Sequence, residues 1–431
     1  MFVDAPVFHV APSQGWVNDP NGPLFYNGRY HLFYQHLSNS ACWSWGLSWG
    51  HVSSSNLVHW TRHPPALLPA QHGSDSDGCF SGCAAVLPAS EAAAAGLAGR
   101  SAHAHAAHAA STATGSNAAA PAAADTGPDA ADAGADVGVP VLLYTGVVLR
   151  PDRDPSVRPS SLAVSELCIE RQLAAVAADA GDPFLLQWRK LPGSWLPAPP
   201  PGLCLNCFRD PFILEQPCPC NGHTWRVMVG AGIRQPGTGL PCAGDAAPAA
   251  AACADGKHST GWSVPAAAGR DAAAAAAAGV EAAARAGPRR AGMGTALVYS
   301  SKQLLSGWQY EGPLCTASRA EQGVVWECPV LAPVPLQQRA AEQQGHSSSF
   351  GATAAQAALS HLFSISCGPR GSGLPGCVYW LGRYAGGKFD LPAAAGPTLL
   401  DLGDLLYAPN LLTVPDQVGS ECAAASSQLD G

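Results

Sequence analysis

The fold class of this chain is decided by residues 24–35, LFYNGRYHLFYQ. Two alternating aromatic runs flank Asn27-Gly28, and this dipeptide between such runs is the strongest short signal for a β-hairpin. A second Asn-Gly, at 221–222, separates FRDPFILEQ from HTWRVMVG, and residues 377–391, CVYWLGRYAGGKFDL, have a third hairpin pattern. No long amphipathic helical pattern separates these runs. Many short antiparallel strands predict an all-β sandwich, barrel or propeller, and no clean repeat chooses among them.

Alanine-rich tracts interrupt the β-patterned blocks. Two long tracts cover residues 89–137 and 234–293, and a shorter tract covers 338–358. The tracts lack the large apolar side chains that bury a core, so we predict low-complexity surface insertions that do not join the sheets. We expect one domain over residues 1–414 and a disordered tail over residues 415–431.

The composition of the 431-residue chain excludes several classes of function. Charged residues make up 13% of the chain and its formal net charge is −8, so we expect no nucleic-acid partner and no anionic membrane surface. No apolar run of about 18 residues is free of charge, Pro or Gly, which predicts no membrane span. The first residues, MFVDAPVFHVAPSQGW, lack the basic and apolar regions of a signal peptide. The cellular compartment stays open.

Three acidic motifs carry the candidate chemistry, and each one contains a proline and adjoins a β-patterned run. They are WVNDPNG at 16–22, FRDP at 208–211 and WECP at 326–329. Taken alone, the first is typical of a β-turn, the second of a local Arg–Asp pair and the third of a strand end. Taken together, they supply what cleavage of a glycosidic bond needs. One carboxylate attacks or acts as base, one carboxylic acid protonates the leaving oxygen, and a third acid can bind sugar hydroxyls.

The three motifs, in this order, resemble the acidic boxes of glycoside hydrolase family 32, the invertase and fructanase family. The first box differs from the usual WMNDPNG by Val17 in place of Met. Further segments are similar to the family's other conserved elements: WGLSWGHVSSSNLVHWTRHPPALLP at 45–69, DGCFSGCAAVLP at 77–88, LLYTG at 142–146 and DLGDLLYAPN at 401–410. The resemblance runs from about residue 8 to residue 414, with the alanine-rich insertions outside it.

This resemblance implies a five-bladed β-propeller with the acids around a funnel at its axis. It implies a retaining β-fructofuranosidase in which Asp19 is the nucleophile, Glu327 the general acid/base and Asp210 a stabiliser of the transition state. The expected partner is a small-molecule sugar, sucrose first, and no cofactor is implied. Further contacts with the fructosyl unit carry over to six residues: Asn18, Gln35, Trp45 (or Trp43), Phe80, Ser81 and Arg209.

Two cysteine pairs, Cys204-x-x-Cys207 and Cys218-x-Cys220, have a spacing that could supply four zinc thiolates. They flank the strand that carries Asp210, where a closed metal site would crowd a sugar pocket. We therefore expect free buried or loop thiols and no metal.

Several alternatives stay open. Within the family, the chain could hydrolyse fructans or transfer fructosyl units. From other classes, it could be an inactive sugar-binding propeller, or an inverting five-bladed glycosidase with its two carboxyls roughly 6.5–9.5 Å apart instead of about 5 Å. The family pattern also ends early. We expect four blades and only the first strand of a fifth, around residues 405–414, with no C-terminal β-sandwich.

Overall fold

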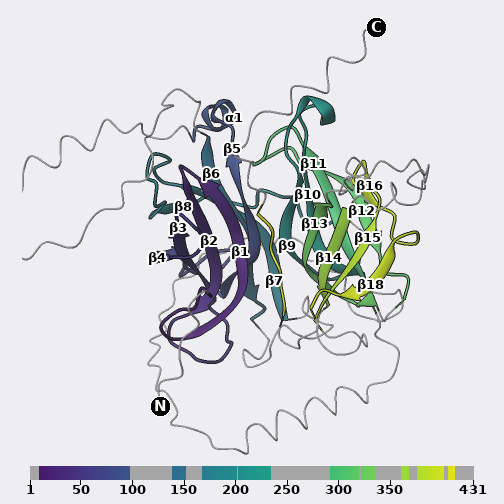
Figure 1. The fold of residues 1–431 in the computed structure, drawn as a ribbon, viewed down its shortest axis with the longest axis horizontal. Coiled ribbons are helices and arrows are strands. Elements are labelled where there is room, and N and C mark those ends of the chain that lie inside the picture. Colours follow the sequence, from purple (N-terminus) through teal and green to yellow (C-terminus); the bar gives the residue numbers. More distant parts are fainter. Residues whose placement is uncertain are drawn as a thin grey trace, which may run out of the picture.

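The computed structural model describes residues 9–97, 138–151, 167–200, 202–233, 292–319, 322–334, 361–367, 376–401 and 406–412. These residues form four antiparallel sheets of four strands each, which we call blades 1 to 4 in chain order. Figure 1 shows blades 1 and 2 on one side of the molecule and blades 3 and 4 on the other. The arrangement is all-β and propeller-like, as predicted.

Blades 1 and 2 contain the first eight strands. Blade 1 consists of β1 (Trp16–Tyr26), β2 (Arg29–Leu37), β3 (Ser48–Ser54) and β4 (Thr61–Leu67). Blade 2 consists of β5 (Gly78–Leu87), β6 (Val139–Leu149), β7 (Cys168–Ala177) and β8 (Trp188–Lys190). The predicted hairpin at 24–35 is confirmed, because Tyr26 pairs with Arg29 across a turn in which Asn27 and Gly28 both have positive φ.

Blades 3 and 4 contain the remaining sheets. Blade 3 consists of β9 (Leu205–Glu215), β10 (Trp225–Ile233), β11 (Met293–Ser301) and β12 (Gln309–Thr316). Blade 4 consists of β13 (Trp326–Pro333), β14 (His361–Cys367), β15 (Cys377–Gly382) and β18 (Ala395–Leu399). Residues 377–391 are not one hairpin: β15 pairs with β14 and β18, and a separate pair, β16 (Tyr384–Ala385) and β17 (Lys388–Phe389), turns at Gly386-Gly387.

The first strand of each blade lies toward a common centre. Strand β5 contacts both β1 and β9, and β9 in turn contacts β13. Large side chains fill the space between the sheets, and Trp49, Trp225, Trp326 and Trp380 are almost completely buried. The packing brings residues that are hundreds of positions apart in sequence to one place, which is what a site built from three motifs requires.

Residues 406–412 form no strand, so the predicted first strand of a fifth blade is wrong for this described part of 405–414. The segment instead spans from blade 4 to blade 1. The backbone N–H of Ala408 donates to Ser366 Oγ on β14, and Asn410 Nδ2 donates to the Pro20 carbonyl on β1. The reason is local, because Pro409 has no N–H for a ladder and Ala408 has a φ of +53°.

One short helix occupies the start of the first alanine-rich tract. Helix α1 (Ala89–Ala94) buries Ala92 against the core, and its Glu91 accepts a hydrogen bond from Trp225 Nε1 on blade 3. This part of the tract packs on the propeller without joining a sheet. Residues 98–137, 234–291, 335–360 and 413–431 lie outside the described residues, so the prediction of insertions and a tail is untested there. Among the helices that the structure describes, none has the length and apolar character to cross a membrane.

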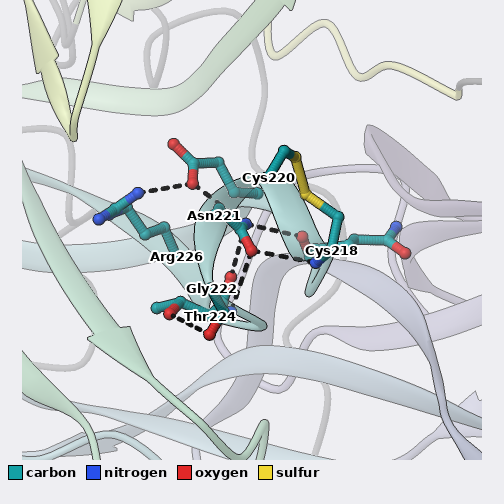
Figure 2. Close-up of a disulfide and its surroundings, with 8 residues drawn as sticks. Cys218, Cys220, Asn221, Gly222, Thr224 and Arg226 are labelled. Atoms are coloured by element: carbon teal, nitrogen blue, oxygen red, sulfur yellow. Dashed lines mark hydrogen bonds and ion pairs between the residues drawn. A yellow bond between two sulfur atoms is a disulfide. The ribbon is translucent and has the colours of Figure 1, made fainter. Parts of the chain in front are cut away.

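A disulfide joins Cys218 to Cys220 in the turn between β9 and β10 (Figure 2). Asn221 organises this turn, because its Oδ1 accepts from the backbone N–H of both Cys218 and Thr224. Cys204 is also disulfide-bonded, whereas Cys207 is free and buried. The expectation of free thiols is therefore wrong for Cys204, Cys218 and Cys220, and the four cysteines do not form a thiolate cluster.

Candidate active site

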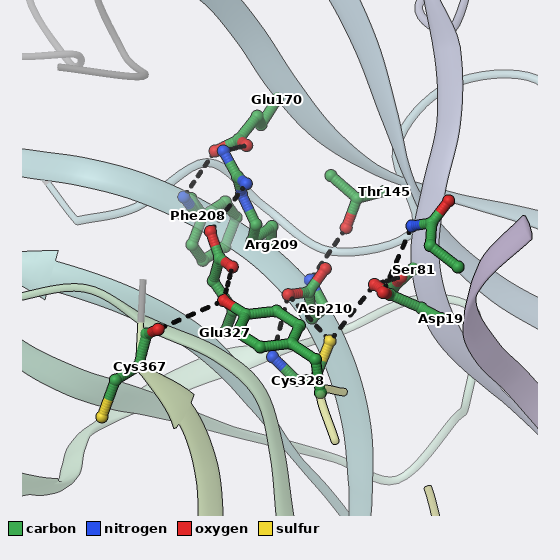
Figure 3. Close-up of polar contacts among 12 residues, drawn as sticks. Asp19, Ser81, Thr145, Glu170, Phe208, Arg209, Asp210, Glu327, Cys328 and Cys367 are labelled. Carbon is green, nitrogen blue, oxygen red and sulfur yellow. Dashed lines mark hydrogen bonds and ion pairs between the residues drawn. The ribbon is translucent and has the colours of Figure 1, made fainter. Parts of the chain in front are cut away.

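Three blades supply the three predicted carboxyls. Asp19 lies on β1, Asp210 on β9 and Glu327 on β13, which are the first strands of their blades. Figure 3 shows the three side chains facing a common space. Cys328 connects them, because its backbone N–H donates to Asp210 Oδ2 at 2.9 Å and its Sγ lies 3.6 Å from Asp19 Oδ2. The three motifs therefore form one site.

Each acid lies at an irregularity of its strand. The β1–β2 register shifts between Val17 and Pro20, and the β13–β14 register shifts between Glu327 and Val330. Asp210 lies where the β9–β10 register shifts, and it has a φ of +60°. Such bulges re-aim side chains and are frequent beside active sites, and positive φ is uncommon for residues with a side chain. The backbone is thus irregular at each of the three residues that carry a carboxyl group.

The strained positions share a sequence feature. Asp210, Cys328 and Ala408 all have positive φ, and each is followed by a proline. Proline blocks the α conformation of the preceding residue and removes the N–H that would continue a ladder. The prolines read as turn signals in the sequence, but Pro211 and Pro329 lie within strands β9 and β13, and Pro409 lies in the segment 406–412.

Asp19 is held by a chain of polar side chains, three of which the family resemblance gave as fructose contacts: Asn18, Gln35 and Ser81. Ser81 Oγ donates to Asp19 Oδ2 at 2.5 Å, and Gln35 Nε2 donates to Ser81 Oγ at 3.0 Å. Asn18 Nδ2 lies between Asp19 Oδ1, at 3.2 Å, and Gln35 Oε1. Trp16 Nε1 donates to Asn18 Oδ1 and fixes that amide. The carboxylate of Asp19 is consequently oriented from both of its oxygens.

Aromatic rings form a second part of the site. The rings of Trp45 and Phe80 are stacked, with centroids 5.9 Å apart and an interplanar angle of 13°. Trp43 meets the edge of Trp45 at 5.3 Å, so both tryptophans named by the sequence belong to one aromatic group. The guanidinium carbon of Arg209 lies 5.6 Å from the Phe80 centroid, which links these rings to the acids.

Arg209 is the buried cation of the site. Its Nη1 lies 3.2 Å from Glu327 Oε1 and its Nη2 lies 2.6 Å from Glu170 Oε1. Arg209 therefore joins the aromatic group to Glu327, and all nine residues predicted for the site belong to one continuous set of contacts. Their roles in binding and catalysis stay predictions.

Four further residues of the site were not predicted. The Tyr407 hydroxyl donates to Glu327 Oε2, and Thr145 Oγ1 accepts the Asp210 backbone N–H at 3.0 Å. Cys328 and Glu170 are the other two. Tyr407, Thr145 and Cys328 all lie within segments that resemble the family, which was the available signal, whereas Glu170 lies in none of them.

Burial raises the proton affinity of two of the acids. The pKa of Asp210 is raised to about 7, chiefly by burial and against the lowering effect of Arg209. Burial also raises the pKa of Glu327, which Arg209 and the Tyr407 hydrogen bond lower in part. When neighbouring carboxyls differ in pKa, one can be protonated while another is ionised at the same pH. Such a site can therefore supply both an acid and a nucleophile.

A small hollow adjoins these acids along the propeller axis. It is lined by Ser81, Asp210 and Cys328 and by the residues that follow them on the inner strands. Pro409 and Asn410 close the side where blades 4 and 1 meet. The lining includes Asp210 and Ser81 but not Asp19, Glu327 or Arg209, so this hollow adjoins the acids and does not enclose all of them.

Several known proteins are similar to this chain in sequence. The acid β-fructofuranosidase 4, vacuolar, of Arabidopsis thaliana is 31% identical over 233 residues, which is 54% of this chain and 24% of that protein. The β-fructofuranosidase 1 of Zea mays is 32% identical over 224 residues, which is 52% of this chain and 24% of that protein. The matches thus span about a quarter of the length of these curated relatives.

Solved structures are similar as well. The fructan 1-exohydrolase IIa of Cichorium intybus has 24% sequence identity and a TM-score of 0.48, over 91% of this chain and 46% of that one. The sequence profile of the glycosyl hydrolases family 32 N-terminal domain matches residues 9–240 and 279–426, which together are most of the chain. This chain belongs to glycoside hydrolase family 32.

Proposed function

We propose that this chain is a retaining β-fructofuranosidase that releases terminal β-D-fructofuranosyl units, with sucrose as the first substrate. The observation that carries the proposal is the meeting of Asp19, Asp210 and Glu327, from three blades, around a space beside the buried Arg209. Membership of family 32 and the β-fructofuranosidase relatives support the choice of a fructosyl substrate.

In the proposed reaction, Asp19 attacks the anomeric carbon C2 of the fructosyl unit while Glu327 protonates the leaving oxygen. The C2–O bond breaks through an oxocarbenium-like state, and a covalent fructosyl–Asp19 ester forms. Glu327, now ionised, takes a proton from water, and the water oxygen attacks C2 from the face that the leaving group occupied. Two displacements at one carbon give net retention.

The remaining groups hold the sugar in this mechanism. Asp210 accepts hydrogen bonds from fructosyl hydroxyls, and these bonds strengthen as positive charge develops at the ring. Ser81 and Asn18 keep the Asp19 carboxylate in place through hydrogen bonds of 2.5 and 3.2 Å. The Trp45–Phe80 stack offers an apolar face for the C–H groups of the sugar.

We also propose that the complete propeller has five blades, as the family resemblance implies. The segment 406–412 lies against β14 of blade 4 and β1 of blade 1, which is where the first strand of a fifth blade would lie. Its Tyr407 already supplies a hydroxyl to Glu327, so this position contributes to the site.

The test is incubation of the purified chain with sucrose, inulin and levan in parallel, followed by quantification of fructose, glucose and longer oligosaccharides. Sucrose hydrolysis should give fructose and glucose in equal amounts. Preferential release of fructose from inulin or levan would assign a fructan hydrolase, and longer oligosaccharides would assign a transferase. Binding of these sugars without any turnover would reject the enzymatic proposal in favour of a sugar-binding propeller.

The stereochemical part of the proposal is tested by recording proton NMR spectra early in the reaction, before mutarotation. The first fructose released should be the β-anomer of the furanose. Initial release of the α-anomer would show inversion and would reject Asp19 as nucleophile.

We expect kcat/KM for sucrose to follow a bell-shaped pH profile. Glu327 must carry a proton when the leaving oxygen departs, and burial raises its pKa above the ordinary glutamate value. A raised pKa keeps the acid protonated to higher pH, so activity falls on the alkaline side only above the range in which free glutamate ionises. On the acid side, activity falls as carboxylates of the site that must be ionised take up protons. A rate that rises steadily into the alkaline range would contradict Glu327 as the acid.

A further inference from the structure

Glu170 is a buried carboxylate beside the site that the proposed reaction does not use. It lies on β7, the third strand of blade 2, and reaches across to β9 of blade 3. Its Oε1 is 2.6 Å from Arg209 Nη2, and its Oε2 accepts the backbone N–H of Phe208 at 2.7 Å (Figure 3). The side chains of Arg209 and Glu170 are only 6% and 5% exposed.

Arg209 therefore lies between two carboxylates. Its distance to Glu170 Oε1, 2.6 Å, is shorter than its distance to Glu327 Oε1, 3.2 Å. The contact with Glu170 is an ion pair without hydrogen-bond geometry, and neither Nε nor Nη2 of Arg209 donates a hydrogen bond to any residue that the structure describes. Arg209 Nη1 does donate a hydrogen bond to Glu327 Oε1, so the guanidinium is placed by that bond, by the negative charge of Glu170 and by the Phe80 ring.

We propose that Glu170 is a positioning residue: it binds the other side of the Arg209 guanidinium and keeps it from moving closer to Glu327 than the present 3.2 Å contact, so that Glu327 retains the proton that it delivers to the leaving oxygen. The inference rests on the proposed role of Glu327 as the acid. Without the Glu170 charge, Arg209 would be a buried cation whose hydrogen-bonded anion is Glu327, and it would move closer to that carboxyl. A closer cation favours the ionised form of a carboxyl, and the proton would be lost at lower pH.

The charges around Glu327 agree with this direction. Arg209 lowers the pKa of Glu327, whereas Asp19 and Glu170 raise it. The groups that face Glu327 come from five places: Asp19 on β1, Glu170 on β7, Arg209 and Asp210 on β9, Cys328 on its own strand and Tyr407 of the segment 406–412. The thiols of Cys207, Cys328 and Cys367 stay neutral, because burial raises the pKa of each. Glu170 therefore acts on Glu327 in two ways: directly, through its negative charge, and indirectly, through its contact with Arg209.

The test is Glu170→Gln, which keeps the shape of the side chain and an oxygen that can accept the Phe208 N–H, and removes only the charge. We expect the alkaline limb of the kcat/KM profile for sucrose to move to lower pH by about half a unit to one unit. The matched control is Glu215→Gln. Glu215 ends β9 and also pairs with an arginine at 2.6 Å, but that arginine is Arg226, which is not part of the site. The control should leave the limb unchanged.

A second variant covers the case in which Glu170→Gln does not fold. Glu170→Asp keeps the charge but withdraws it from Arg209 by one methylene, so we expect a smaller shift in the same direction. An alkaline limb at the wild-type position in whichever of the two variants folds would overturn the inference, while leaving the proposed function intact.

A third measurement separates the inference from the proposed function. The carboxyl carbon of Glu327 can be followed by NMR in protein labelled with ¹³C-glutamate, and its signal is identified by its loss in Glu327→Gln. Its titration midpoint should fall in Glu170→Gln even if the wild-type chain releases no fructose. A lower midpoint without activity would reject the proposed function alone, and an unchanged midpoint would reject the role of Glu170.

Discussion

Asp19→Asn is expected to lower kcat for sucrose by roughly 10⁴-fold or more, as does removal of other covalent nucleophiles. Asparagine has the same shape as aspartate and keeps an oxygen for the Ser81 hydroxyl, which donates to Asp19 Oδ2 at 2.5 Å. The amide is a very poor nucleophile toward C2, so the covalent intermediate cannot form at a useful rate. The measurement is fructose release at saturating sucrose by enzyme purified to exclude traces of wild type.

Its control is Asp390→Asn, which makes the same chemical change at an exposed position near the end of blade 4. The side chain of Asp390 accepts only the Ala393 backbone N–H among the described residues, and asparagine can accept it too. This variant should keep wild-type kcat and KM. Retention of more than about one hundredth of the activity in Asp19→Asn would mean that Asp19 does not attack the sugar.

The parts of the fold that local sequence determines were predictable. The hairpin at 24–35 follows from Asn27 and Gly28, which adopt the positive φ that the turn needs. At the second Asn-Gly, residues 221–222, the flanking strands β9 and β10 do pair, but of the two residues only Gly222 has positive φ, because Asn221 ends a 3₁₀ turn within a longer connection. The number of blades and their closure depend on contacts between distant strands, and these leave no pattern in any one segment.

The site was predictable as a set of residues but not as a geometry. The motif order pointed to Asp19, Asp210 and Glu327 through family resemblance, and alone each motif was typical of a turn or a strand end. The prolines that suggested turns instead mark bulges within strands, as at Asp210, where φ is +60°. A dipeptide such as Asp-Pro does not distinguish these two outcomes, since both need a break in the hydrogen-bond ladder.

Glu170 and Tyr407 show what sequence reasoning misses. Glu170 acts through the contact of β7 with β9, two strands of different blades, and no spacing rule connects residues 170 and 209. Tyr407 lies in a segment that was predicted to be a strand, and strand alternation says nothing of a hydroxyl that reaches Glu327 from irregular chain. Both contacts follow from the packing of whole blades, which only the three-dimensional structure defines.

Glu327→Gln is expected to lower kcat for sucrose by about 10²–10⁴-fold, because the glucosyl oxygen must then leave without a proton. Glutamine can still accept from Tyr407 and can still face Arg209 Nη1, which lies 3.2 Å from Glu327 Oε1 in the wild type. Loss of the proton donor, rather than loss of the fold, should therefore account for the effect. Thermal melting within a few degrees of wild type is the accompanying check.

The leaving group distinguishes Glu327 from Asp19. Fluoride needs little help from an acid, so Glu327→Gln should react with β-D-fructofuranosyl fluoride far faster than with sucrose, whereas Asp19→Asn should lose both activities alike. The second step then lacks its base, and azide, which has no proton to lose, should restore turnover in Glu327→Gln and give the β-fructosyl azide. If the variant is equally slow with the fluoride and with sucrose, and azide has no effect, then Glu327 is not the acid/base. The proton donor would then have to be sought elsewhere among the described carboxyls, first at Asp210, whose pKa burial raises to about 7.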